Sequence, residues 1–73
     1  MPKQLHLDVV ITKEESKYVS WCPQLDVASC GDSLEEAREN LKEAVELYLE
    51  DKDAKILHPV TSITLTSIEV KSP

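Results

Sequence analysis

Apolar and polar residues alternate at the start of the chain in a pattern that predicts strands. Apolar side chains take every second position over residues 5–11, which is typical of a half-buried strand. The polar run at 13–16 indicates a hairpin connection, so residues 18–22 form the second predicted strand. Pro23 has no amide to donate to a sheet and ends that strand.

A third strand and a helix start follow. Residues 25–30 complete the predicted strands, and Gly31 closes them at a point where a positive φ would cost least. Ser33 and Glu36 then fit a capping box, in which the hydroxyl accepts from the Glu36 amide and the carboxylate accepts from the Ser33 amide. Such a cap stabilises a helix by about 1 kcal/mol.

The helix has an apolar stripe with three- and four-residue steps, and its pattern ends at residues 51–53. The stripe consists of Leu34, Ala37, Leu41, Ala44, Val45 and Tyr48. Most of the other positions are acidic, and they include Glu39, Glu43 and Glu46. We expect those carboxylates to face solvent or a partner.

Residues 62–70 are rich in Ile, Thr and Val and predict a fourth strand. Ile63 and Leu65 point to one side, whereas Ile68 and Val70 point to the other, so the strand contains a bulge or is covered on both faces. A doubly apolar strand of this kind is a candidate for contact with a second copy.

The predicted order is β-β-β-α-β, an α+β fold class with one helix packed on a small, mainly antiparallel sheet. We expect one domain over residues 1–73, with no C-terminal DNA-binding domain. A chain of this size buries only about 60% of its unfolded surface, so its core is marginal and a homo-oligomer, dimer or tetramer, is expected.

The charge balance disfavours several partner classes. Eight basic and fourteen acidic residues give a net charge of -6, which argues against direct nucleic-acid binding and against anionic membranes. A basic protein is the favoured partner. No signal-peptide or membrane-length apolar run is present, so we expect a cytoplasmic protein. Cys22 and Cys30 are out of register for a bridge and are expected to be reduced thiols.

The face that carries Trp21 depends on the hairpin turn. An even-numbered turn places Trp21 with Val10 and Val19 on the face opposite the core, where small Ser20 leaves room for the helix. An odd-numbered turn places Trp21 in the core instead. We favour the first arrangement, which makes an apolar patch suited to a homomeric or toxin interface.

Several segments in order carry a resemblance to a known family. They read YVSWCPQL at 18–25, GDSLEEA at 31–37 and LKEA at 41–44, followed by Tyr48 and Leu49. This combination resembles the HicB antitoxin family. The resemblance implies a partly degraded ribonuclease-H-like fold that is not an enzyme and that binds and neutralises HicA, a small basic toxin that cleaves mRNA. The alternative is a stand-alone homo-oligomeric module that binds a small molecule or an unrelated protein.

Catalytic and metal-binding interpretations find little support. A ribonuclease-H-type site needs carboxylates from several elements. Asp8 is available on the first strand and Glu36, Glu39 or Glu43 on the helix, but the last strand has no acid until Glu69. Cysteine and histidine lack the spacing of zinc ligands, so no metal or cofactor is expected. The available side chains of these types are Cys22, Cys30, His6 and His58.

The predicted site is therefore a protein interface made of three groups. Its residues are Val10, Val19 and Trp21 on the sheet, Ile68 and Val70 on the last strand, and Glu39, Glu43 and Glu46 on the helix.

Overall fold

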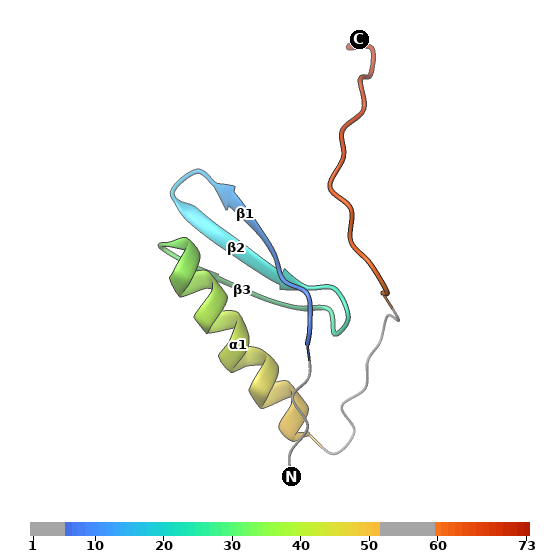
Figure 1. Ribbon diagram of the computed structural model, residues 1–73. Helices are drawn as coiled ribbons and strands as arrows, with labels where there is room; N and C mark the ends of the chain where they lie inside the picture. The colour runs from blue at the N-terminus through green and yellow to red at the C-terminus, as the bar shows by residue number, and fades with distance from the viewer. Residues whose placement is uncertain (1–5, 52–59) are drawn as a thin grey trace.

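The computed structural model describes residues 6–51, called here the body, and residues 60–73, called the C-terminal arm. The body contains β1 (Val10–Glu14), β2 (Lys17–Cys22), β3 (Val27–Gly31) and α1 (Leu34–Glu50). The strands form one antiparallel sheet in the order β1-β2-β3, and α1 lies across one face of it (Figure 1). The predicted α+β class is confirmed.

The first hairpin has a two-residue turn. Glu15 and Ser16 connect β1 to β2, with Glu15 at a φ of 57°. Ile11 pairs with Ser20, and the ladder continues to the very end of β1. The first strand therefore begins and ends later than the predicted range of 5–11. Pairing with β2 extends β1 into the polar run, whereas residues 6–9 have no strand pairing.

The turn between β2 and β3 contributes to the core. Pro23, Gln24 and Leu25 are buried there, and the Asp26 amide donates to the Cys22 carbonyl at 2.8 Å. Because Leu25 serves as a core side chain inside the turn, β3 begins two residues later than predicted. Asp26 has a φ of 55°, which an aspartate tolerates better than most residues.

Gly31 is required for space and not for its backbone angle. Its φ is not positive, contrary to our prediction. A Cβ on Gly31 would lie 2.5 Å from the Ala37 amide nitrogen, closer than real Cβ atoms approach backbone. The end of β3 thus touches the first turn of α1, and only a glycine permits that contact.

Only one of the two hydrogen bonds of the predicted capping box is formed. Ser33 is the N-cap, and its hydroxyl accepts from the Glu36 amide at 3.1 Å. The Glu36 carboxylate accepts from the Asp32 amide at 3.2 Å, one residue before the expected partner. Both bonds satisfy amides at the helix start, and the acidic first turn suits the helix dipole.

The core lies between the sheet and the buried side of α1. Cys22, Leu25 and Leu41 form its centre, and four partly buried residues pack against them: Leu7, Val27, Val45 and Tyr48. Ser20 is fully buried and donates to the Ala37 carbonyl at 2.8 Å, so the small side chain lets the helix approach as predicted. Leu34 was assigned to the core stripe but is 52% exposed.

The predicted fourth strand over 62–70 is not part of the sheet. Residues 60–73 have no strand pairing, and the C-terminal arm runs away from the body (Figure 1). The reason is geometric: an extended segment becomes a strand only beside a partner strand, and the arm has none among residues 6–51 and 60–73. His58 and Pro59 lie outside the described residues. Within the described ranges, no helix has the length and apolarity required to cross a membrane.

Candidate protein interface

The sheet face opposite α1, called here the open face, carries the predicted apolar patch. Val10 pairs directly with Trp21, and Val19 pairs with Cys30, so these side chains share that face. The even-numbered turn is confirmed, and Trp21 lies on the opposite face from Ser20. Trp21 is 40% exposed, and its indole Nε1 donates to the Asp26 carboxylate at 2.9 Å. Trp21 is therefore held in place before any partner arrives.

Glu39, Glu43 and Glu46, called here the acidic row, are exposed on α1. Glu39 and Glu43 lie on the helix side turned away from buried Ala37 and Leu41, and Glu46 lies at the rim of a groove described below. The body as a whole has four basic and twelve acidic residues, a net charge of -8. Such a charge attracts basic proteins and speeds their encounter.

The predicted interface residues do not converge on one surface. The open face and the acidic row lie on opposite sides of a two-layer body, so a flat partner contacts one of them at a time (Figure 1). Ile68 and Val70 are on the C-terminal arm, 83% and 77% exposed. The structure therefore divides the eight residues among three surfaces.

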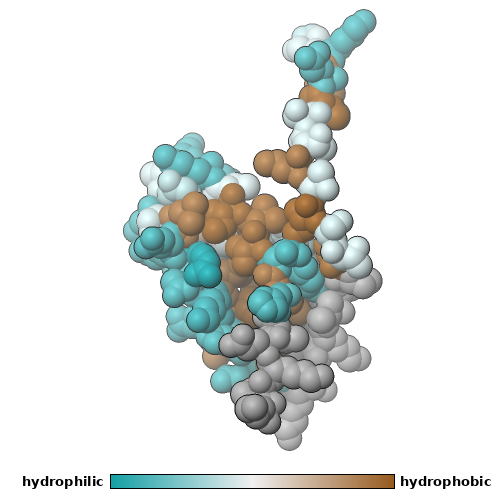
Figure 2. Space-filling view, viewed as in Figure 1, coloured by the Kyte–Doolittle hydropathy of each residue, from teal (hydrophilic) through white to brown (hydrophobic). Residues whose placement is uncertain are grey.

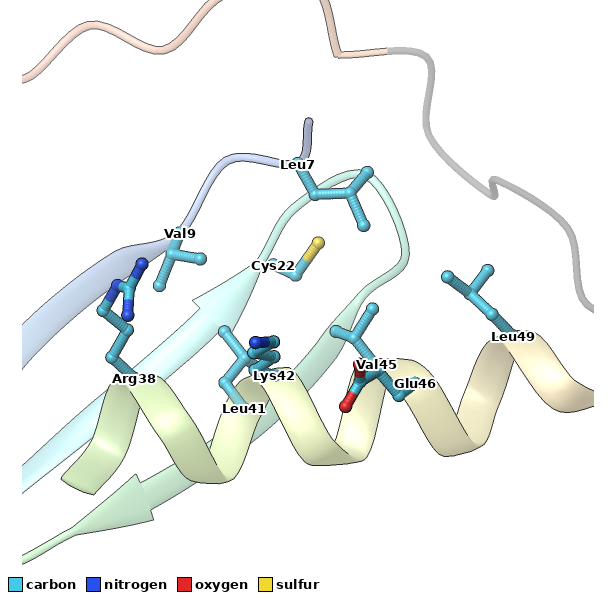
Figure 3. Close-up of a pocket in the computed structure, with 9 residues that line it drawn as sticks. All are labelled: Leu7, Val9, Cys22, Arg38, Leu41, Lys42, Val45, Glu46 and Leu49. Carbon is cyan, nitrogen blue, oxygen red and sulfur yellow. The ribbon is translucent and has the colours of Figure 1, made fainter. Parts of the chain in front are cut away.

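A groove that we did not predict runs between residues 7–9 and α1. It has a volume of about 400 Å³. Its apolar lining is Leu7, Val9, Cys22, Leu41, Val45 and Leu49, and its charged rim is Arg38, Lys42 and Glu46 (Figure 3). One feature of the sequence could have indicated this groove: Arg38 and Lys42, the two basic residues of α1, both lie beside its apolar stripe. Figure 2 shows apolar residues gathered across the body and along the arm.

Gln24 fixes the position of residues 7–9, which form one side of the groove. Its buried side chain donates to the Asp8 carboxylate at 2.6 Å and accepts from the Asp8 amide at 3.2 Å. These two bonds attach residues 6–9 to the β2–β3 turn. Asp8, a candidate for a metal-binding carboxylate in the sequence, is exposed and accepts a hydrogen bond from the Gln24 side-chain amide. Within residues 6–51 and 60–73, no three His, Cys, Asp or Glu side chains lie close enough together to hold a metal ion.

The two thiols lie on different faces of the sheet. Cys22 is buried on the α1 side, whereas Cys30 is exposed on the open face; both are free, as predicted. A disulfide between them would have to pass through the sheet.

Lys17 and Asp32 form an exposed ion pair at 2.6 Å. The hydrogen bond to Asp32, together with its negative charge, raises the pKa of Lys17 above its ordinary value. The pair links the start of β2 to the loop that enters α1.

Comparison with known proteins places the chain in a family. The UPF0150 protein of Helicobacter pylori (strain J99) is 47% identical to it over 49 residues, which are 66% of this chain and 68% of that protein. The chain belongs to the UPF0150 family. A second UPF0150 protein, ssr1765 of Synechocystis sp. (strain PCC 6803), is 42% identical over 52 residues, which are 67% of this chain and 66% of that relative. No family model matches the chain, and no solved structure matches it.

Proposed function

We propose that this UPF0150 protein is a HicB-like antitoxin module that binds and neutralises a basic, mRNA-cleaving toxin of the HicA type and has no catalytic activity of its own. The observation that carries the proposal is an acidic body with a positioned tryptophan on an uncovered sheet face. The resemblance of residues 18–25 and 31–37 to HicB antitoxins supports it.

In the proposed complex, charge attracts the toxin to the body and apolar contact supplies most of the affinity. Its net charge of -8 brings a basic toxin toward it, an effect that weakens as salt rises. Affinity then comes from the open face, where Trp21 supplies an aromatic anchor already held by Asp26. A pre-positioned anchor loses little side-chain freedom on binding.

Co-expression with a short basic protein from a neighbouring reading frame tests the proposal. We expect the chain to restore growth and to retain the basic protein in a pull-down whose yield falls with salt. Trp21→Ala should abolish rescue, while the matched control Leu47→Ala, which removes an apolar side chain that is 64% exposed on α1, should preserve it. Circular dichroism would verify that both variants are folded. If the wild-type chain neither binds nor rescues, the proposal is wrong.

The second candidate is a stand-alone homo-oligomeric module without a toxin partner. The apolar groove and the exposed apolar arm favour it, because both are surfaces that another copy could cover. It would be preferred if sedimentation showed a homo-oligomer and no adjacent gene encoded a basic protein.

A further inference from the structure

Trp21 and Asp26 form a connected pair at one end of the open face, where β2 ends and the turn to β3 follows. Both residues are exposed. Their hydrogen bond uses the edge of the indole and one carboxylate oxygen, Oδ1. The second carboxylate oxygen can still accept, and the face of the indole is not used by this bond. The pair therefore presents an aromatic surface and a negative charge side by side.

The β2–β3 turn fixes the position of Asp26. Its amide donates to the Cys22 carbonyl at 2.8 Å, and its φ is 55°. Residues 23–25 of the same turn are buried, so the turn cannot shift without disturbing the core. The carboxylate and the indole are thus both placed before a ligand arrives, and little side-chain freedom is lost on binding.

The neighbours of the indole leave space on the β3 side. Trp21 pairs with Val10 on β1 and with Ala28 on β3. Val10 is partly buried, whereas Ala28 is exposed and has only a methyl group as its side chain. Asp26 directly precedes β3. A flat group stacked on the indole from this side would therefore lie above Ala28 and next to the carboxylate.

No cation among the described residues occupies this space. The body has four basic residues. Lys13 lies 5.7 Å from the centre of the Tyr18 ring, and Lys17 is bound to Asp32. Lys17 is also four positions from Trp21 along β2, about 13 Å at 3.3 Å per residue. The other two basic residues are on α1, on the opposite side of the sheet (Figure 1).

We propose that Trp21 and Asp26 form a subsite, called here the arginine subsite, for one arginine side chain of the basic protein partner. This inference rests on the proposed function, because the arginine belongs to the toxin. The guanidinium lies on the indole face, which attracts a cation, and donates to the second oxygen of the Asp26 carboxylate. Arginine is favoured over lysine because its planar group stacks and donates in several directions, whereas an ammonium is more strongly hydrated.

Short peptides test the arginine subsite without the toxin. The probes are an acetylated heptapeptide that alternates glycine with arginine and the same peptide with lysine, which has an equal charge. Trp21 is the single tryptophan of the chain, so its fluorescence and its indole ¹H–¹⁵N signal report binding at this position. We expect both peptides to bind through charge, and the arginine peptide to bind about threefold to tenfold more tightly. Equal affinities would overturn the proposal.

Asp26→Asn separates the charge of the subsite from its geometry. The amide oxygen can still accept from the indole, and asparagine tolerates a φ of 55°, so Trp21 keeps its position. We expect the preference for the arginine peptide to disappear. Glu14→Gln is the matched control, because it removes an equal charge from the far end of the open face. A preference that survives Asp26→Asn, or that falls equally in Glu14→Gln, would refute the subsite.

The complex with the basic protein distinguishes a failure of the subsite from a failure of the proposed function. If the wild-type chain binds and rescues, Asp26→Asn should raise the dissociation constant by about tenfold and Glu14→Gln by less than about twofold. A complex indifferent to Asp26→Asn would refute the subsite and leave the antitoxin proposal standing. An arginine preference in the peptides without any rescue would refute the toxin as the source of the arginine.

Discussion

The body and the C-terminal arm have similar β-type patterns but different structures. In the body, two short turns return each strand beside the previous one, and every buried side-chain nitrogen or oxygen in the described ranges has a hydrogen-bond partner. The arm has equally apolar side chains but no strand beside it. Alternation therefore predicts an extended conformation, while a partner edge decides whether that conformation becomes a sheet.

The difference follows from how the two regions obtain their partners. A two-residue turn supplies β1 with a neighbour locally, at a small cost in loop-closure entropy. The arm lies after α1, so no hairpin supplies its neighbour. The body is complete within one copy, whereas the homo-oligomer of the second candidate function would supply the arm with a neighbour.

The largest effect is expected from a matched pair of leucines. Leu41 is 1% exposed in the core, and Leu65 is 99% exposed on the arm. Leu41→Ala should lower the free energy of unfolding by about 3 kcal/mol, because it leaves a cavity. Leu65→Ala should leave the unfolding of the monomer unchanged. Chemical denaturation in dilute solution measures both values, and equal losses would remove the distinction between the regions.

A smaller but still clear effect is expected at the contact between β3 and α1. Gly31→Ala introduces a Cβ 2.5 Å from the Ala37 amide nitrogen, and backbone must move to relieve it. We expect the free energy of unfolding to fall by about 2 kcal/mol. Ser29→Ala on the same strand is the control. A thermal midpoint unchanged by Gly31→Ala would show that α1 does not press against the end of β3.

The smallest effect is expected from the Lys17–Asp32 pair. Because the pKa of Lys17 is raised above its ordinary value of 10.5, its stabilising contribution is complete below that value and is lost as the pH rises through the raised one. Exposure of both side chains keeps the contribution small. The stability difference between wild type and Lys17→Met should shrink above about pH 10.5. A difference that grows there would contradict the assignment.

Much of the body could be predicted because its determinants are local. The polar run at 13–16, Pro23 and the Ser33 cap lie within a few residues of the elements they delimit, and small Ser20 indicated the helix-facing side. The role of Gly31 was missed because it depends on a contact made only after α1 packs on the sheet.

The residues of each interface surface could be predicted, but the positions of these surfaces relative to one another could not. Period-two alternation located Val10, Val19 and Trp21 on one face. Alternation carries no information about the layer on which a helix lies, so the separation of the acidic row from the open face could not be foreseen. The groove was missed because Leu7 and Val9 reach it only through the bonds between Asp8 and Gln24.

Amide hydrogen exchange as a function of protein concentration tests the central claim most directly. The body should show the same protection in its sheet and helix at every concentration, since its hydrogen bonds lie within one copy. Amides of residues 62–70 should exchange rapidly in dilute solution, and they would become protected with rising concentration only in the homo-oligomer of the second candidate function. Protection of the arm that is already complete in dilute solution would contradict an arm without a neighbouring strand in its own copy.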